Sequence, residues 1–429
     1  MDLTEQMREV ATRSKAASHR LTQLDTDQKN RCLLAMAQAL LDNRQAIQEA
    51  NAKDLETAQE MKLSGAMVDR LILNETRIQG MAQGLREMAA LPDPVGRELD
   101  RKERPNGLIL RKVATPIGVI VIIYESRPNV TADAAGLCFK SGNATILRGG
   151  KEAIHSNQVI ARLMVQAASA CEPQFPAEAI QVLETTNREA IPALLSLTGL
   201  VDLCMPRGGE GLIRAVAACS KVPVIKHYKG VCHVHIDKEA DLEMAVRVAI
   251  NAKTHRPGVC NAMETLLVDR AIASEYLPKV ATELAAHEVG LRGDSEVVSI
   301  LQPLIEKQQL ALKLETATEE DWHAEYLDLV LAIRVVDNLE AAIAHINHYG
   351  SGHSDAIITS DETRAQWFMR DVDASAVYWN ASTRFTDGAE FGMGAEIGIS
   401  TDKIGARGPM GLEELTSYKW LCFGNGQIR

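Results

Sequence analysis

Aromatic residues are scarce in this chain, at 4% of 429 residues, and this scarcity argues against a surface that stacks nucleic-acid bases. Positive charge is not in excess, because 57 acidic residues outnumber 46 Lys and Arg and leave a net charge of −11. We therefore expect neither nucleic acid nor an anionic membrane as a partner. Apolar runs of membrane-spanning length are also missing, and residues 1–20 contain no secretory h-region. These absences predict a cytoplasmic protein with no membrane segment.

Closely spaced cysteines and histidines are missing as well. The eight cysteines form no CxxC pair, so the sequence gives no zinc-site spacing and no disulfide framework, and we expect reduced thiols. The 11 histidines form no HExxH motif, and we expect no bound metal. Apolar residues at 46% and charged residues at 24% are typical of a globular protein, and the length calls for two or three domains.

The first hundred residues predict a helical region. An amphipathic helix over 1–21 precedes a second helix whose predicted N-cap is Asp27, and helix continues to the Pro-Asp-Pro stretch at 92–94. Residues 97–117 differ, because apolar and polar residues alternate beside an Asn-Gly turn at 106–107. This pattern predicts a β-hairpin. A lone hairpin is marginal in water, so it should find partners in a sheet or in a second subunit.

Apolar strands alternate with helical segments from residue 118 onward. Strands are predicted at about 118–124, 144–148, 179–183, 201–205 and 222–225, then at 231–236, 264–268, 297–301, 328–336, 356–359, 376–379 and 418–428. Several runs are continuously apolar, as is typical of parallel sheets covered by helices on both faces. The sequence thus predicts an α/β fold with two Rossmann-like parallel-sheet domains plus a β-hairpin and C-terminal strand. Ligands of such sheets sit at the carboxyl ends of the strands.

The loop at 255–260 is the first candidate for chemistry. A Pro-Gly pair breaks regular structure after a helix over 240–253, and Cys260 follows just before a buried strand. Two potentially cationic side chains, His255 and Arg256, precede the thiol, and nearby positive charge favours the nucleophilic thiolate. The simpler alternative is that Cys260 is a small apolar core residue, as many free cysteines are.

Two glycine-rich turns are candidates for binding phosphate, and each should lie between a strand and a helix. Paired glycines at a helix N-terminus let backbone N–H groups approach an anion. For either turn alone, an ordinary tight connection is the simpler interpretation, but two of them in one sheet favour a nucleotide. Cationic side chains at the first turn could hold a 2′-phosphate, which favours NADP over NAD. The residues concerned are Arg148, Gly149, Gly150 and Lys151 in the first turn, and Pro206, Arg207, Gly208 and Gly209 in the second.

Two further polar groups follow predicted strands. Asn129 comes after the strand at 118–124, and its side-chain amide suits an oxyanion hole. The alternative is an asparagine in a turn after Pro128. The stretch 380–388 offers hydroxyls, an amide and a guanidinium that could bind a carboxylate or a phosphate, or could simply form a capped polar loop. Its candidate residues are Asn380, Ser382, Thr383 and Arg384.

Taken together, these segments resemble the aldehyde dehydrogenase superfamily. The matching stretches lie at 124–131, 140–152, 206–209, 251–261, 378–388 and 406–412, and their order and number make the resemblance specific over the whole chain. Within the superfamily, the chain is most similar to members that reduce gamma-glutamyl phosphate. The resemblance implies a cofactor-binding domain at 1–96 and 118–238, a catalytic domain at 239–411, and an oligomerisation module at 97–117 and 412–429.

The resemblance also implies a reaction and its residues. L-Glutamyl 5-phosphate would be reduced by NADPH to L-glutamate 5-semialdehyde and phosphate, through a thioester on Cys260, as the second step of proline biosynthesis. Asn129 and the Cys260 N–H would hold the oxyanion, Glu325 would hold the nicotinamide ribose, and Arg127 and Arg256 would join the 380–384 residues in binding substrate. A homo-oligomer, dimer or tetramer, is implied, and direct transfer of substrate from a glutamate 5-kinase is possible.

One departure from the wider superfamily concerns water. Hydrolytic members carry a glutamate that activates water, whereas residues 226–230 contain no acid here. We hypothesise that Lys226 and Lys229 attract phosphate instead. Three alternatives stay open from sequence: another phosphorylating or CoA-acylating aldehyde dehydrogenase, a cysteine hydrolase that pairs Cys260 with His255, and a nucleotide-binding regulatory module without turnover.

Overall fold

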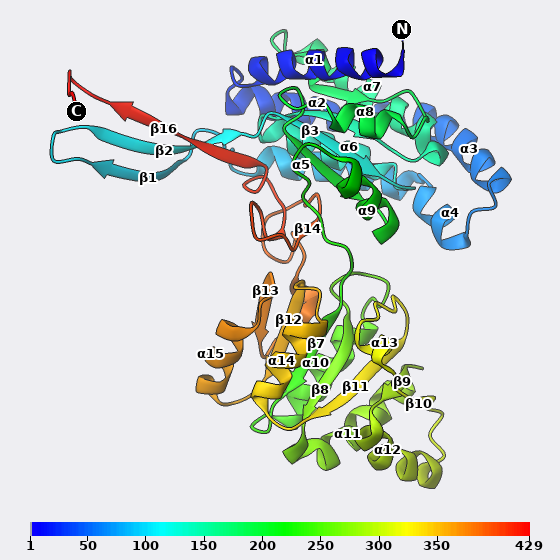
Figure 1. Ribbon diagram of the computed structural model, residues 1–429. Helices are drawn as coiled ribbons and strands as arrows, with labels where there is room; N and C mark the ends of the chain where they lie inside the picture. The colour runs from blue at the N-terminus through cyan, green and yellow to red at the C-terminus, as the bar shows by residue number, and fades with distance from the viewer. Residues whose placement is uncertain (1) are drawn as a thin grey trace. The chain divides into compact units, whose positions relative to one another are not determined.

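The computed structural model describes residues 2–429, and the chain divides into two compact units (Figure 1). The first unit contains the residues up to Lys226 together with Gly392–Gly398 and Pro409–Arg429, and the second contains His227–Phe391 and Ile399–Gly408. The boundary precedes strand β7 (Cys232–Ile236), because β7 pairs with strands of the second unit. No helix within residues 2–429 is long and apolar enough to cross a membrane.

Five helices open the first unit, where the sequence predicts a helical region. The second helix begins earlier than expected, because its N-cap is Asp25 and not Asp27. The Asp25 side chain accepts from the N–H of Gln28 at 2.8 Å, and the Gln28 side chain accepts from the N–H of Asp25 at 2.9 Å. The five are α1 (Leu3–Leu21), α2 (Thr26–Asp42), α3 (Arg44–Glu60), α4 (Gly65–Leu71) and α5 (Glu75–Ala90).

The sheet of the first unit is parallel, with strand order β5-β4-β3-β6. Its strands are β3 (Val119–Tyr124), β4 (Ala144–Arg148), β5 (Ile180–Val182) and β6 (Leu203–Arg207). The helices that connect or follow them are α6 (Asn129–Lys140), η1 (Lys151–Ala153), α7 (Ile154–Cys171), η2 (Ala177–Ala179), α8 (Ala190–Leu195) and α9 (Glu210–Cys219). The strand predicted at 222–225 is reduced to one bridge between Val224 and Cys204, because Pro223 has no N–H to give to a ladder.

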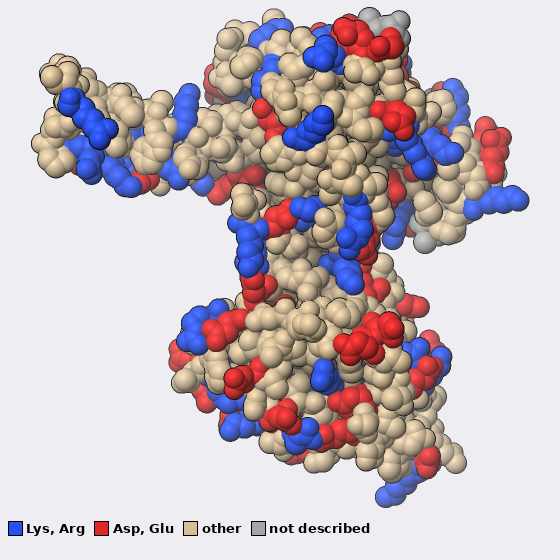
Figure 2. All heavy atoms as spheres, in the orientation of Figure 1, with Lys and Arg blue, Asp and Glu red and all other residues tan. Residues whose placement is uncertain are grey.

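An antiparallel arm completes the first unit. The predicted hairpin is confirmed as β1 (Glu98–Glu103) and β2 (Ile109–Pro116), and β2 also pairs with β16 (Thr416–Phe423). The third strand thus supplies the partner that the hairpin needs. Figure 1 shows the arm extending from the helices of its unit, and Figure 2 shows Lys and Arg side chains along it. In the arm, Lys112 of β2 lies over the ring of Tyr418 of β16, with its Nζ 3.6 Å from the centroid.

The second unit is built on a seven-stranded parallel sheet with the order β10-β9-β11-β8-β7-β12-β13. Buried Leu266 and Val268 of β8 face a core shared with α10, α11 and α12, whereas Leu267 faces α14 and α15. The elements after β7 are α10 (Leu242–Thr254), β8 (Met263–Asp269), α11 (Arg270–Ala286), β9 (Gly290–Gly293), α12 (Ser295–Gln308), β10 (Leu314–Thr316), α13 (Glu319–Trp322), β11 (Val330–Val336), α14 (Leu339–Tyr349), β12 (Ser354–Ile358), α15 (Glu362–Asp371), β13 (Ala376–Trp379) and η3 (Thr383–Phe385). Two short strands, β14 (Ile399–Ser400) and β15 (Gly408–Pro409), follow.

The prediction of a strand at 297–301 is wrong, because this stretch belongs to helix α12. Asp294 caps that helix by accepting from the N–H groups of Glu296 and Val297. The apolar residues Val297 and Leu301 are both buried, and their spacing of four residues places them on one helical face.

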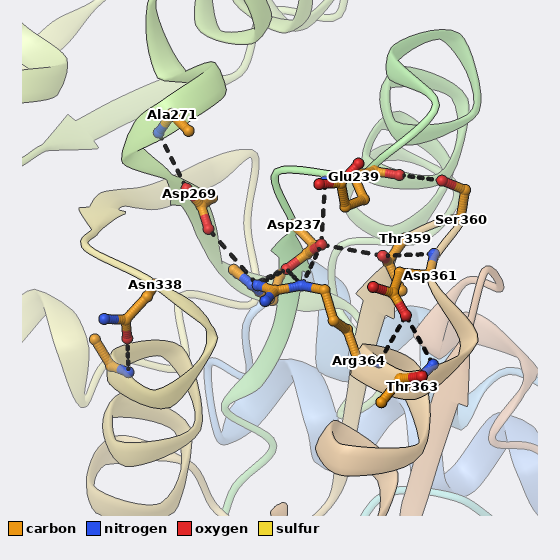
Figure 3. A network of polar contacts seen from close by, with 12 residues as sticks. Asp237, Glu239, Asp269, Ala271, Asn338, Thr359, Ser360, Asp361, Thr363 and Arg364 are labelled. Carbon is orange, nitrogen blue, oxygen red and sulfur yellow. Dashed lines mark hydrogen bonds and ion pairs between the residues drawn. The ribbon is translucent and has the colours of Figure 1, made fainter.

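At the carboxyl ends of strands in the second sheet, side chains of the protein bind one another in a polar network (Figure 3). Arg364 donates from Nε to both carboxylate oxygens of Asp237 at 2.8 Å, and the Thr359 hydroxyl donates to Asp237 at 3.0 Å. Burial opposes the charged form of Asp237, but hydrogen bonds from His235 and Arg364 outweigh it and hold its pKa below the ordinary value. Side chains of the protein itself therefore occupy this edge of the second sheet, where a ligand was expected.

Candidate active site

Cys260 lies on the loop between α10 and β8. The helix ends at Thr254 and the strand begins at Met263, so the predicted order of helix, loop and buried strand is confirmed. The Cys260 side chain is partly exposed, and none of the eight cysteines forms a disulfide among the residues that the structure describes. Because the loop precedes β8, Cys260 lies at the amino end of this strand, opposite to the edge closed by Asp237.

Gly230 and Cys232 fix the backbone of Cys260 from the side of β7. A Cβ on Gly230 would overlap the Cys260 carbonyl oxygen and lie 2.7 Å from the Cys260 Cα, so only glycine fits there. The Cys232 thiol donates to the same carbonyl oxygen at 3.2 Å. Burial, and then the Asp355 carboxylate, raise the pKa of Cys232 well above its ordinary value. Cys232 therefore stays protonated and serves as a donor to the Cys260 backbone.

The segment after β13 reaches the Cys260 loop through Asn261. The Asn261 side-chain amide donates to the carbonyl oxygen of Thr386 at 2.8 Å, and the Thr383 hydroxyl donates to the carbonyl oxygen of Asn261 at 2.7 Å. Arg384 donates to the Asn261 side-chain oxygen, and Ser382 accepts from the Arg384 N–H at 3.3 Å. The structure thus brings Ser382, Thr383 and Arg384 to the predicted nucleophile. The two hydroxyls are buried and hold the loop together.

Arg384 brings positive charge to the surroundings of Cys260. Burial and the Arg256 guanidinium lower the pKa of Arg384, while interactions with Asp387, and then with Cys260 and Cys232, act in the opposite direction. The charge of Arg384 therefore favours the Cys260 thiolate. His255 and Arg256, the candidates for this tuning in the sequence, both have exposed side chains.

The structure does not place Asn380 with these residues. Its side-chain N–H donates to the carbonyl oxygen of Thr359 at 3.0 Å, and its side-chain oxygen accepts from the N–H of Thr359 at 3.0 Å. Thr359 follows β12 and belongs to the network at the carboxyl edge of the sheet. Asn380 also has a φ of 55°, which asparagine tolerates better than most residues. Its role here is to shape the turn after β13.

Glu325 reaches the Cys260 loop through Gly230. Its Oε1 accepts from the Gly230 N–H at 2.8 Å, and Gly230 lies against the Cys260 backbone. Beside it, the Lys229 ammonium donates to the carbonyl oxygen of His323 at 2.7 Å. Gly230 therefore contacts both Glu325, which is predicted to hold the nicotinamide ribose, and Cys260, the predicted nucleophile.

Sequence reasoning missed Lys253 and Glu264, which form a buried ion pair beneath this loop. The Lys253 Nζ lies 2.6 Å from the Glu264 Oε2, and both side chains are 0% exposed. Burial raises the pKa of Glu264 to about 7 against the opposing effect of Lys253, and burial lowers the pKa of Lys253. A signal was present, because each is a charged residue at an apolar position of its helix or strand.

In the first unit, Asn129 is the first residue of α6, directly after the loop that follows β3. Its side-chain amide donates to the Asp133 carboxylate at 3.1 Å. Burial raises the pKa of Asp133 to about 6, against the effects of Asn129 and Arg207. This contact fixes the Asn129 amide and uses one of its two N–H groups. Arg127, in the same loop, has an exposed side chain.

Each predicted glycine turn lies against a carboxylate of the protein itself. The Gly209 N–H donates to the Glu125 Oε2 at 3.0 Å, and a Cβ on Gly208 would lie 2.8 Å from the Glu125 Cδ. In the other turn, a Cβ on Gly150 would overlap the Glu152 carboxylate. A side chain at Gly208 or Gly150 would have to displace the carboxylate, which is the far end of a flexible side chain. The Gly209 N–H is oriented toward an anion, because it already donates to a carboxylate.

Arg148 and Lys151 give the first turn donors for a phosphate group. The Arg148 guanidinium donates to the carbonyl oxygens of Gly149 at 3.0 Å and Thr186 at 3.3 Å. Its Nε is buried without a hydrogen-bond partner, and the Lys151 side chain is exposed. An orphaned guanidinium N–H and an exposed ammonium at a strand end fit the phosphate groups of a dinucleotide.

Comparisons with known proteins match this chain to a family. The model of the aldehyde dehydrogenase family matches residues 3–324 and 316–421. A gamma-glutamyl phosphate reductase from Moorella thermoacetica is 54% identical over 429 residues, which span 100% of both chains.

Two solved structures of gamma-glutamyl phosphate reductases are similar as well. The structure from Thermotoga maritima has a TM-score of 0.94 at 43% identity and covers 99% of both chains. The structure from Saccharomyces cerevisiae has a TM-score of 0.53 at 32% identity and covers 98% of both chains. These matches confirm the predicted α/β fold of the aldehyde dehydrogenase type.

Proposed function

This chain belongs to the aldehyde dehydrogenase family, and we propose that it reduces L-glutamyl 5-phosphate to L-glutamate 5-semialdehyde and phosphate with NADPH, the second step of proline biosynthesis from glutamate. Its full-length likeness to gamma-glutamyl phosphate reductases supports this substrate. The observation that carries the chemistry is the thiol of Cys260, whose backbone is fixed by Gly230 and whose loop is joined to Arg384 through Asn261.

Cys260 supplies the nucleophile in this proposal. Its thiolate attacks the acyl carbon, phosphate leaves with the bonding electron pair, and a thioester forms on Sγ. The charge of Arg384 favours the thiolate before attack. The Cys260 N–H and the Asn129 side chain hold the oxyanion that develops on the acyl oxygen.

The residues around the thioester decide what happens to it. The dinucleotide, when bound, supplies the hydride that reduces the acyl group. Residues 226–230 contribute no acid to activate water, so the thioester is protected from hydrolysis. Lys226 and Lys229 attract the phosphate, and Arg127, Arg256 and Arg384 bind the anionic groups of the substrate. The groups that hold the cofactor are Arg148, Gly149, Gly150, Lys151, Pro206, Arg207, Gly208, Gly209 and Glu325.

Further proposals concern the assembly. The first unit holds most of the cofactor, the second unit carries the nucleophile, and the arm of β1, β2 and β16 joins copies of the chain into a dimer or tetramer. Exposed aromatic side chains on β16 support this role for the arm. The acyl phosphate is labile, and we propose supply by a glutamate 5-kinase in the cytoplasm.

The reverse reaction tests the proposed function. Purified protein is incubated with L-glutamate 5-semialdehyde, NADP and phosphate, and each component is omitted in turn while NADPH absorbance is followed. We expect reduction of NADP only when phosphate is present. Turnover without phosphate that releases glutamate would indicate a hydrolytic dehydrogenase, and turnover that requires coenzyme A in place of phosphate would indicate an acylating one.

A further inference from the structure

The buried ion pair of Lys253 and Glu264 spans the loop that carries the nucleophile. Lys253 lies in the last turn of α10 before the loop, and Glu264 is the second residue of β8 after it. Their side chains meet at 2.6 Å with no exposed surface. Since the desolvation of a buried ion pair offsets most of its attraction, an apolar pair of similar size would serve stability equally well. The pair therefore calls for a role beyond stability.

A second contact ties the same pair to the segment of Glu325. The other carboxylate oxygen of Glu264 accepts from the Leu327 N–H at 3.2 Å, and Leu327 has a φ of 53°, which is unfavourable for a leucine. The ring of Tyr326, the residue before it, has its centroid 5.8 Å from the Lys253 Nζ. Glu264 therefore holds the chain two residues after Glu325 in a conformation that it would not adopt by itself.

These contacts form a closed ring of residues that includes the nucleophile. Glu325 accepts from the Gly230 N–H, Gly230 lies against the Cys260 backbone, and Cys260 leads along the chain to Glu264, which holds Leu327. A displacement at any point of this ring moves both Cys260 and Glu325. Neither Lys253 nor Glu264 has exposed side-chain surface through which it could touch a substrate.

We propose that Lys253 and Glu264 are positioning residues whose ion pair fixes the Cys260 loop against the segment that carries Glu325. The inference deepens the proposed function, on which it rests for the roles of Cys260 and Glu325. The pair acts through geometry, so its loss lowers the rate of thioester formation even in protein that remains folded.

The chain offers a matched control at the opposite edge of the same sheet. Arg364 neutralises the fully buried carboxylate of Asp237 (Figure 3), as Lys253 neutralises Glu264. Arg364→Met and Lys253→Met each remove a cation from a buried carboxylate, but only Lys253 lies beside the nucleophile loop. Lys253→Arg keeps the charge and the hydrogen bond, and it should retain most of the rate of the unmodified protein in the reverse reaction.

The test compares Cys260 reactivity, turnover and stability in these variants. Alkylation of Cys260 by iodoacetamide is followed against pH by mass spectrometry of its peptide, without substrate or cofactor, and the melting temperature is measured on the same samples. We expect Lys253→Met to slow alkylation by about tenfold and the reverse reaction by about a hundredfold, whereas Arg364→Met changes both by less than about threefold. Glu264→Gln, which keeps an acceptor for Leu327, should resemble Lys253→Met and replaces it if that variant does not fold.

A folded Lys253→Met or Glu264→Gln protein with the alkylation rate, pH profile and turnover of Arg364→Met would overturn the proposal. Failure of the proposed function would be seen separately, as turnover of the unmodified protein without phosphate. The alkylation comparison does not depend on that result, because it uses neither substrate nor cofactor.

Discussion

Single residues near Cys260 act mainly on its backbone. Gly230 and Cys232 contact the Cys260 carbonyl oxygen, and Asn261 joins the next peptide unit to Thr383 and Arg384. Because the reacting atoms must meet within a few tenths of an ångström, such main-chain supports are as important as the thiol.

Gly230→Ala should reduce activity strongly. The new Cβ would overlap the Cys260 carbonyl oxygen, so the nucleophile loop has to move, and we expect a loss of about a hundredfold in kcat/KM. Gly258→Ala is the matched control, because the atom nearest to its new Cβ, the Leu327 carbonyl oxygen, is at an ordinary 3.7 Å. Steady-state kinetics of both variants in the reverse reaction, with melting temperatures, check the prediction. Equal activity of the two variants would contradict it.

Arg384→Met should make Cys260 harder to ionise. Removal of a partly buried positive charge that interacts with the thiol disfavours the Cys260 thiolate, which loses its favourable partner. The alkylation profile of Cys260 should therefore move to higher pH. Arg256→Met removes an exposed charge and should move the profile less, because solvent screens it. A larger effect of Arg256→Met would return the tuning role to Arg256, as the sequence predicted.

At the scale of elements, strands and helices with a clear apolar period were predictable, and local hydrogen bonding explains most exceptions. The stretch at 297–301 is rich in β-branched residues, yet the Asp294 cap starts a helix there. The true strand β9 has the sequence Gly-Leu-Arg-Gly over 290–293, too short and too polar to give a strand signal. A one-dimensional pattern does not show which of two competing local structures the neighbouring elements stabilise.

The candidate site was predictable where one motif carries the chemistry. Cys260 stands out through its broken loop, and the 382–384 stretch contacts Asn261, the next residue along the chain. The resemblance, and not the spacing, singled out Glu325. The sequence marks Glu264 as a charged residue at an apolar position, but neither Glu264 nor Gly230 could be assigned to the site, because their contacts come from strands and loops far apart in sequence. Asn380 was grouped with its neighbours in sequence, although its amide bonds Thr359 at the other edge of the sheet.

The amino end of β12 predicts a dependence of stability on pH. Burial, with a contribution from His227, lowers the pKa of His353 to about 3, whereas an unfolded histidine titrates near pH 6.5. Because the unfolded chain takes up the proton first, the free energy of unfolding should fall as the pH drops below about 6.5, by about 2 kcal/mol at pH 5. Urea denaturation across this pH range measures the effect. His353→Asn should remove that part of the dependence, and an unchanged slope would refute this origin.

At the scale of the whole molecule, the arm of β1, β2 and β16 exposes aromatic side chains that its own unit does not cover. Trp420→Glu on β16 should therefore dissociate the proposed oligomer, because it places a charge on an exposed aromatic position of an edge strand. Trp420 is 43% exposed, and Met369 on α15, at 41%, is a control of equal exposure outside the arm. Sedimentation velocity of Trp420→Glu and Met369→Glu checks the prediction. Loss of the oligomer in both variants, or in neither, would count against the arm.

The division into two units also determines how the chemistry should be tested. The predicted nucleophile and Glu325 belong to the second unit, whereas Asn129 and the glycine turns belong to the first. A measurement on the intact protein that reports directly on Cys260 is therefore more decisive than any single substitution.

Mass spectrometry of the trapped acyl-enzyme is that measurement. The protein is incubated with L-glutamate 5-semialdehyde and NADP without phosphate, quenched in acid and digested, and the Cys260 peptide is analysed. We predict a glutamyl thioester on Cys260 that accumulates without phosphate and disappears when phosphate is added. An unmodified Cys260 peptide, a glutamyl group on another residue, or an adduct whose level is independent of phosphate would contradict a thioester mechanism at Cys260.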